Sequence, residues 1–243
     1  MTSHAEPPPI IGHRGAAGHA PENTLASVVR AHELGATWVE VDVKLTDDSM
    51  PVLFHDDTLD RTTDGHGALA ACTLEELRGR DAGAWFGPEF AGEQIPTLAG
   101  LIVALTDLGM GLNLELKPCP GRAAETGRAV ADMLVRTWPA DLPAPVVSSF
   151  DPAALAAFGA AAPGIELAFL VHRLPPDWLA IATRLGAGAL HCDVKFLKRH
   201  QVGEIIGAGF KVRCYTVNDG PQAARLFKWG VQSVISDYPD RMP

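Results

Sequence analysis

The sequence predicts a TIM-type (β/α)8 barrel with an early β-hairpin and an inserted cap segment. Short apolar runs of strand character alternate with amphipathic stretches along the chain. One gap between two such runs, at 47–50, is too short for a parallel crossover, so these two runs must form an antiparallel hairpin. Without the second strand of that hairpin, eight strands remain, which is the number in a TIM barrel.

Nine runs have the length and composition of strands, and the first begins close to the N-terminus. The predicted strands are 9–14, 38–46, 51–55, 112–117, 146–150, 165–171, 187–194, 211–217 and 232–236. Helical periodicity lies between most of them. The predicted helices are 24–34, 98–108, 122–138, 152–161, 176–185, 198–206 and 221–229.

Residues that commonly cap helices precede several of these stretches. Asn23, Thr97 and Asp151 each stand immediately before a predicted helix, where a side-chain oxygen can accept a hydrogen bond from a free backbone N–H. The segment 237–243 is too short to supply a complete eighth helix. We therefore expect seven outer helices and an incomplete last unit.

The hairpin loop is predicted to centre on Asp48 and Ser49, which places His55 directly across from Asp42. The region 56–94 then interrupts the strand and helix alternation. It is rich in turn residues and contains one short helix candidate, 73–80. We interpret it as an inserted lid or cap over the barrel mouth, because a loop of this length is usually functional or disordered.

Composition excludes several classes of protein. The chain has 243 residues, with 20 Lys and Arg against 29 Asp and Glu, and its net charge of −9 would repel a nucleic acid. Neither a leader-like N-terminus nor an apolar run long enough to span a bilayer is evident, so we expect a cytoplasmic protein without stable membrane insertion. Four cysteines without a CxxC pair indicate reduced thiols. One domain over 1–243 is expected.

Charged residues concentrate at the C-terminal ends of predicted strands, where barrel enzymes keep their active sites. Strand alternation puts Glu40 and Asp42 on one face, and it does the same for Glu115 and Lys117. Three carboxylates in one barrel mouth would repel one another unless a divalent cation neutralised them, and oxygen ligands favour Mg²⁺, Ca²⁺ or Mn²⁺. The alternative is that these charges form ion pairs that close the barrel end.

Two histidines and two cations accompany the carboxylates. His13 and His55 could divide general-base and general-acid roles near neutral pH. Arg14 and Lys117 are the natural ligands of a phosphoryl group. Together with a metal ion, these residues predict a substrate that carries a phosphodiester.

The motifs that contain these residues resemble the glycerophosphodiester phosphodiesterase family. The resemblance spans nearly the whole chain, and the motifs are specific as a set. They are HRG at 13–15, PENT at 21–24, EVDV at 40–43, HD at 55–56, ELKP at 115–118 and YTVND at 215–219. The family often has Trp at the position of Tyr215, so the wall that packs on the glycerol end of the substrate differs here.

The resemblance implies a role for each residue in these motifs. Glu40, Asp42 and Glu115 would hold the divalent ion, while His13 and His55 would serve as the acid and base. Arg14 and Lys117 would bind phosphate, Glu22 would support the catalytic groups, and Asn23 would line the pocket as well as cap the first helix. The implied reaction is hydrolysis of a small glycerophosphodiester to sn-glycerol 3-phosphate and an alcohol. The attacking group is either water or, through a cyclic phosphate, the glycerol hydroxyl of the substrate.

Two alternatives stay open. A lysophospholipase D would need an apolar groove for an acyl chain, which Trp85, Phe86 and Phe90 could build, although these side chains could equally form a small core of the insertion. A catalytically silent phosphodiester-binding protein would keep the barrel without the reaction. The preferred headgroup, the oligomeric state and the roles of His191 and Asp193 are not determined by the sequence.

Overall fold

A computed structural model describes residues 6–243 of the chain, so the first five residues, which are part of the N-terminus considered above, lie outside it. Eight parallel strands form a closed ring, because the first pairs with both the second and the last. They are β1 (Ile10–His13), β2 (Trp38–Leu45), β4 (Gly111–Leu116), β5 (Val146–Ser149), β6 (Glu166–Val171), β7 (Ala189–Asp193), β8 (Lys211–Tyr215) and β9 (Ser233–Ser236). The predicted TIM barrel is confirmed, whereas a single domain over 1–243 stays a prediction.

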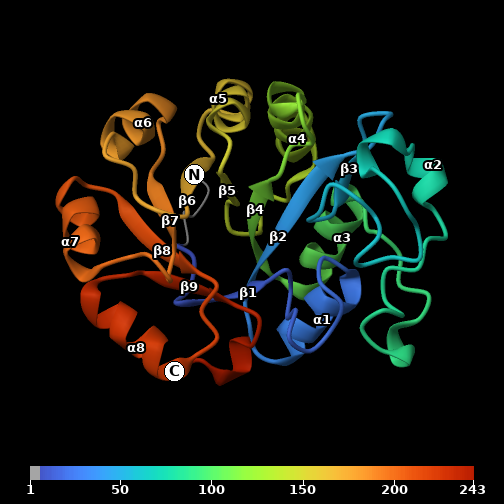
Figure 1. Cartoon of the computed structure of the whole chain (residues 1–243), viewed down its shortest axis with the longest axis horizontal. Coiled ribbons are helices and arrows are strands. Elements are labelled where there is room, and N and C mark those ends of the chain that lie inside the picture. The colour runs from blue at the N-terminus through green and yellow to red at the C-terminus, as the bar shows by residue number, and fades with distance from the viewer. Residues whose placement is uncertain (1–5) are drawn as a thin grey trace.

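Helices surround the ring of strands, as Figure 1 shows. The outer helices are α1 (Leu25–Glu33), α3 (Leu98–Leu108), α4 (Ala123–Thr137), α5 (Pro152–Ala161), α6 (Trp178–Leu185), α7 (Arg199–Gly207) and α8 (Gly220–Trp229). After β9, the described residues form the 3₁₀ turn η3 (Pro239–Arg241). Among residues 6–243, none of the helices combines the length and the apolar composition that a membrane-spanning helix needs.

Strand alternation divides the side chains between two cores. On β2, Val39, Val41 and Val43 belong to the large apolar core, which also includes the buried faces of the helices. The intervening Glu40 and Asp42 therefore point into the barrel, on the same side as Trp38, which packs in a small core inside the ring. The period-two pattern thus places carboxylates in the barrel interior.

The early hairpin is present, but its predicted register is wrong by one residue. Strand β3 (Pro51–Leu53) pairs antiparallel with β2 so that Leu53 lies opposite Val43. The loop has three residues, not two, because the N–H of Thr46 bonds to the carbonyl of Met50. Ser49 adopts a left-handed backbone, with φ of 60°, as a three-residue loop of this kind requires.

The shift in register changes how His55 reaches the barrel mouth. The N–H of Phe54, not that of His55, bonds to the carbonyl of Asp42. His55 follows the end of β3 and enters the mouth from the first residues of the connection to α3, so its expected position directly across from Asp42 is not observed.

The connection from β3 to α3 forms a small unit with its own core. It contains η1 (Leu69–Ala71), α2 (Leu74–Leu77) and η2 (Pro88–Phe90), so the predicted helix over 73–80 is shorter than expected. Figure 1 shows this insertion on the outer side of β2 and β3, beside α1 and α3, and not across the centre of the ring.

Apolar residues from several parts of this unit are buried together. They are Val52, Phe54, Leu59, Leu69, Leu77, Ala82, Ile95 and Cys119. Trp85, Phe86 and Phe90 are not part of this core; Phe86 packs edge to face against Trp85 and against Phe90. The suggestion that these three aromatic residues form the core of the insertion is therefore wrong.

Candidate active site

Three carboxylates meet at the C-terminal end of the barrel. Glu40 and Asp42 on β2 and Glu115 on β4 are buried, and one oxygen from each lies within 4.8 Å of the others. The parallel register pairs Asp42 with Glu115, which brings the two strands together at this level. The convergence expected from strand alternation is thus present.

Two cations pair with these carboxylates. Lys117 Nζ lies 3.2 Å from Asp42 Oδ1 and 3.0 Å from Glu115 Oε1, while Arg14 Nε lies 3.2 Å from Asp42 Oδ2. Both Arg14 and Lys117 therefore lie at the cluster, as expected. Within residues 6–243, two permanently charged cations pair with these three carboxylates, and one of them, Arg14, also pairs with Glu22, so ion pairs alone do not balance the cluster.

The electrostatics of the cluster show the same imbalance. Burial and the charge of Asp42 raise the pKa of Glu115 to about 7 and raise the pKa of Glu40 well above its usual range. Burial alone would also raise the pKa of Asp42, but Arg14 and Lys117 outweigh it and hold that pKa below its usual range. Buried oxygen ligands that are this crowded fit a hard divalent cation.

His13 lies beside the carboxylates and is oriented by a residue from the last strand's end. Its Nδ1 is 2.5 Å from Oδ1 of Asp237, and its Nε2 is 3.8 Å from Oε2 of Glu40. Asn218 in turn donates its Nδ2–H to Asp237 Oδ2 at 2.6 Å. With Nδ1 bonded to Asp237, the Nε2 atom of His13 is the one available to a reacting group.

His55 is held at Nδ1 by an aspartate, as His13 is. Its Nδ1 is 2.5 Å from Oδ1 of Asp56, and Asp56 accepts two hydrogen bonds from Arg61. Burial lowers the pKa of His55, although Asp42 partly opposes this shift. This shift favours the neutral imidazole, which is the form that can accept a proton.

An unusual backbone conformation places Arg14 beside the carboxylates. Arg14 has φ of 48°, a left-handed conformation that non-glycine residues adopt infrequently, and its N–H donates to Glu40 Oε2 at 3.2 Å. A Cβ on the next residue, Gly15, would lie 2.3 Å from Ser27 Oγ. The HRG motif therefore needs glycine where the chain packs on α1.

The PENT segment contributes two residues to the site, and one predicted role is wrong. Glu22 Oε1 accepts a hydrogen bond from Arg14 Nη1 at 2.6 Å. Asn23 does not cap α1, because the cap is Thr24, whose hydroxyl accepts from the N–H of Ser27. The amide of Asn23 instead bonds twice to Asp42, through Nδ2 to Oδ2 at 2.9 Å and through Oδ1 to the N–H at 3.0 Å.

An aromatic group stands at the ends of β5, β6 and β8. Phe150 stacks on His172 with ring centroids 4.5 Å apart, and Tyr215 meets Phe150 edge to face at 5.9 Å. The Tyr215 hydroxyl donates to the carbonyl of Val171. Asp193 lies near this group, with Oδ2 3.6 Å from His172 Nδ1. Tyr215 is thus part of a wall at the mouth, on the strand end where it was expected.

His191 is not part of this wall. It is fully buried inside the barrel, and its Nε2 lies 3.2 Å from Nη1 of Arg213. Burial and the neighbouring guanidinium lower the pKa of His191 well below its usual value. His191 thus lies in the barrel interior beside Arg213 and not among the aromatic side chains at the mouth.

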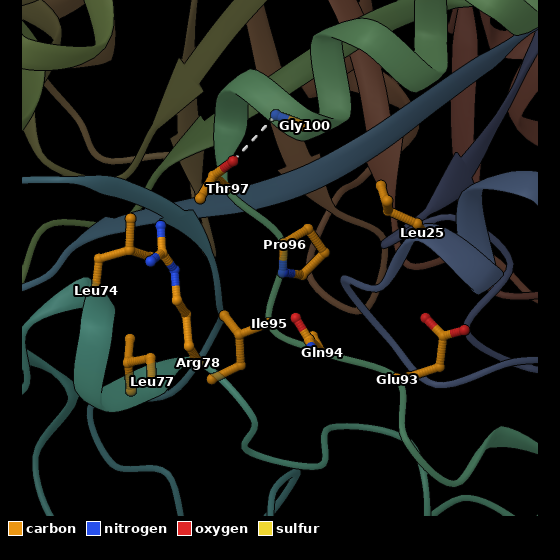
Figure 2. A pocket seen from close by; sticks show the side chains of 10 residues that line it. All are labelled: Leu25, Leu74, Leu77, Arg78, Glu93, Gln94, Ile95, Pro96, Thr97 and Gly100. Carbon is orange, nitrogen blue, oxygen red and sulfur yellow. Dashed lines mark hydrogen bonds between the residues drawn. The ribbon is translucent and has the colours of Figure 1, made fainter.

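A cavity of about 260 Å³ lies away from the carboxylates, and Figure 2 shows its lining. Leu74 and Leu77 of α2 lie on one side of Ile95 and Pro96, and Leu25 lies on the other. Thr97 caps α3 by accepting a hydrogen bond from the N–H of Gly100. None of the candidate site residues lines it. Ligand pockets usually measure about 300–1,000 Å³, so this cavity gives no support for an acyl-chain groove.

Comparison with known proteins agrees with this geometry. The sequence model of the glycerophosphoryl diester phosphodiesterase family matches residues 13–241. The chain belongs to this family. Glycerophosphodiester phosphodiesterases of Caldanaerobacter subterraneus subsp. tengcongensis and Bacillus altitudinis are 34% and 32% identical to it, each over 96% of this chain and 95% of the relative.

Solved structures of glycerophosphodiester phosphodiesterases share its barrel. A phosphodiesterase of Oleispira antarctica, solved with its product sn-glycerol-3-phosphate, superposes with a TM-score of 0.93 at 45% identity, over 96% of this chain and 94% of that one. The enzyme of Agrobacterium tumefaciens has a TM-score of 0.76 at 26% identity, over 96% and 97% of the two chains. The resemblance stated from the motifs is confirmed.

Three charged residues that contact the proposed catalytic or phosphate-binding groups, directly or through one side chain, were not predicted as site residues. Asp237 follows β9, and the rule that polar residues gather at strand ends could have found it. Asp56 is part of the HD motif but received no role of its own. Arg61 belongs to the insertion, and no pattern in the sequence indicates that it reaches Glu22.

Proposed function

We propose that this chain hydrolyses glycerophosphodiesters to sn-glycerol 3-phosphate and a free alcohol. The observation that carries the proposal is the pair of imidazoles, His13 and His55, placed beside three clustered carboxylates and each held at Nδ1 by an aspartate. Membership of the family supports the same reaction. The Oleispira antarctica relative, which holds sn-glycerol-3-phosphate as product, supports the choice of product.

Each residue at the site has a role in this proposal. Arg14 and Lys117 bind the phosphate oxygens, since both are fixed at the cluster by ion pairs. One histidine accepts the proton of the attacking hydroxyl as its oxygen bonds to phosphorus. The other protonates the alcohol oxygen as its bond to phosphorus breaks. With water as the attacking group, this step gives sn-glycerol 3-phosphate and the alcohol directly. With the glycerol hydroxyl of the substrate, it gives a cyclic phosphate and the alcohol, and water then adds to phosphorus as a ring P–O bond breaks to give sn-glycerol 3-phosphate.

Glu40, Asp42 and Glu115 are proposed to hold Mg²⁺, Ca²⁺ or Mn²⁺. When bound, the ion supplies positive charge that stabilises the phosphoryl oxygens in the transition state. Asn23 fixes Asp42 through two hydrogen bonds, and Glu22 fixes Arg14. We further propose that Tyr215 packs on the substrate, because its ring lies at the mouth beside Phe150.

The His13→Ala variant tests the catalytic part of this proposal. Loss of a general acid or base costs about 10²- to 10⁴-fold in rate, while a histidine at the mouth contributes little to the core. We expect turnover of glycerophosphocholine to fall by that factor, with the circular dichroism spectrum and divalent-ion affinity close to those of the wild type. Full turnover in this variant would remove His13 from the mechanism and would leave His55 as the only histidine at the cluster.

A further inference from the structure

Arg61 connects the insertion to the active site through two carboxylates. Its Nη1 and Nη2 donate to the two oxygens of Glu22 at 2.8 and 2.7 Å. Its Nε and Nη2 donate to the two oxygens of Asp56 at 2.6 and 3.0 Å. Both carboxylates are thus bound in the two-bond geometry that suits the planar guanidinium.

Each of these carboxylates touches a residue of the proposed mechanism. Asp56 Oδ1 lies 2.5 Å from Nδ1 of His55, and Glu22 Oε1 accepts from Nη1 of Arg14 at 2.6 Å. Arg61 is therefore linked to the proposed acid–base residue His55 through Asp56, and to the proposed phosphate ligand Arg14 through Glu22. It touches neither of them directly.

This arginine differs from an ordinary surface ion pair. Its side chain is 45% exposed, but the side chains of Glu22 and Asp56 are only 13% and 27% exposed. Arg78, elsewhere in the insertion, forms a single pair with Glu75 in which the two side chains are 66% and 79% exposed. Isolated exposed pairs of that kind contribute little, whereas networks of two-bond pairs hold a fixed geometry.

Arg61 also changes how much of Arg14 is available to a substrate. Without it, Arg14 would be the one cationic partner of Glu22 in the described part of the chain, and Glu22 would compete with phosphate for that guanidinium. Because Arg61 occupies both oxygens of Glu22, part of the charge of Glu22 is compensated from the insertion side. The positive charge of Arg14 is then less fully offset at the site.

We propose that Arg61 is a positioning residue for phosphodiester hydrolysis. Its contact with Asp56 orients His55, and its contact with Glu22 reduces how far Glu22 offsets the positive charge of Arg14. This inference rests on the proposed function of the site. It gives the insertion a role in the reaction, because Arg61, near the start of the insertion, bonds to Glu22 in the loop between β1 and α1.

The two connections have separable kinetic consequences. The contact with Asp56 fixes the orientation of the His55 imidazole, so loss of this contact lowers kcat. A misplacement of a reacting group by about 1 Å can lower the rate about 10²-fold. The Glu22 connection controls charge at the phosphate ligand, so its loss raises KM. Lysine keeps the charge but cannot form the planar two-bond contacts with both carboxylates.

Steady-state kinetics of Arg61→Ala and Arg61→Lys on glycerophosphocholine test the proposal. We expect Arg61→Ala to lower kcat about 10- to 100-fold and to raise KM several-fold. We expect Arg61→Lys to restore KM largely but kcat only slightly. The matched control is Arg78→Ala, which removes an exposed arginine of the same insertion and should leave both parameters unchanged. Wild-type kcat and KM in Arg61→Ala would overturn the proposal.

Double variants identify the route by which Arg61 acts. If it acts on kcat through Asp56, then Arg61→Ala should add little to the kcat loss already caused by Asp56→Ala. Fully additive losses in kcat would contradict this route.

A spectroscopic readout separates failure of this inference from failure of the proposed function. The side-chain ¹⁵N resonances of His55 should shift in Arg61→Ala, because Asp56 is no longer held, while those of exposed His66 should not. Unchanged His55 resonances would overturn the inference even if the wild type hydrolysed its substrate. A wild type without turnover, but with shifted His55 resonances in the variant, would instead refute the proposed function and retain the positioning contact.

Discussion

His13 and Asp237 are 224 positions apart in the sequence, yet Nδ1 of one lies 2.5 Å from Oδ1 of the other. The contact exists because β1 pairs with β9 and closes the barrel. Burial would raise the pKa of Asp237, but its hydrogen bond with His13 outweighs that effect and lowers the pKa. Asp237 is thus an anion that fixes the orientation of the imidazole.

The first prediction concerns this contact. Asp237→Asn should lower kcat about 10- to 100-fold, because the imidazole loses the anion that aligns it. The comparison is Asp240→Asn, which alters a second histidine–aspartate pair, with His19 Nε2 2.8 Å from Asp240 Oδ1, outside the carboxylate cluster. Equal rates in the two variants would show that the bond between His13 and Asp237 does not serve catalysis.

The second prediction separates two adjacent residues at the start of α1. Thr24→Ala removes the helix cap and should lower the free energy of unfolding by about 1 kcal/mol with little loss of kcat. Asn23→Ala removes two hydrogen bonds to Asp42 and should lower the turnover rate at least tenfold more than Thr24→Ala does. Chemical denaturation and steady-state assays check the pair. The opposite pattern would mean that Asn23 is the structural cap after all.

Most of the fold was predictable because its elements have local causes. All nine strands and the seven outer helices lie where hydrophobic periodicity placed them, with ends that differ by at most a few residues. The hairpin register failed because it depends on loop length, and Ser49 adopts a left-handed backbone that favours glycine. A three-residue loop therefore formed where two residues were assumed.

The site was predictable where strand alternation decides the outcome. Glu40, Asp42 and Glu115 converge because parallel strands place alternate residues on one face. The supporting residues were not predictable, since the contact of Arg61 with Glu22 joins two loops whose proximity depends on the closed barrel. Asn23 was assigned as a cap from its local sequence, and its tertiary partner, Asp42, lies 19 positions away.

The third prediction concerns the metal ligands. Glu115→Gln removes one of three clustered carboxylates and should weaken divalent-ion binding at least about tenfold, with a rate that recovers partly at high ion concentration. Glu75→Gln, which alters an exposed pair in the insertion, is the control. Calorimetric titration of each protein with Mg²⁺, Ca²⁺ and Mn²⁺ measures the affinities and identifies the preferred ion. Unchanged affinity for all three ions in Glu115→Gln would contradict the ligand assignment.

The fourth prediction is a pH dependence of stability that originates at His191. Its pKa in the folded state lies well below 6.5, so the unfolded chain binds a proton more readily, and stability is lost as the pH falls below about 6.5. The loss is at most about 1.4 kcal/mol per pH unit. Below about pH 6.5, the free energy of unfolding should fall less steeply with pH in His191→Gln than in the wild type. In His66→Gln, at an exposed histidine, it should fall as steeply as in the wild type. Parallel slopes in all three proteins would exclude His191 as the source.

The central claim is metal-dependent hydrolysis of a glycerophosphodiester. Release of sn-glycerol 3-phosphate from glycerophosphocholine, followed with and without EDTA by a coupled dehydrogenase assay, tests it most directly. We expect release by the purified protein with a divalent ion, loss of release with EDTA, and recovery when the ion is restored. Full activity in EDTA would contradict the role of the carboxylate cluster. No release from any glycerophosphodiester by a folded protein that binds the ion would contradict the proposed reaction, and turnover of a lysolipid would then favour the lysophospholipase D alternative.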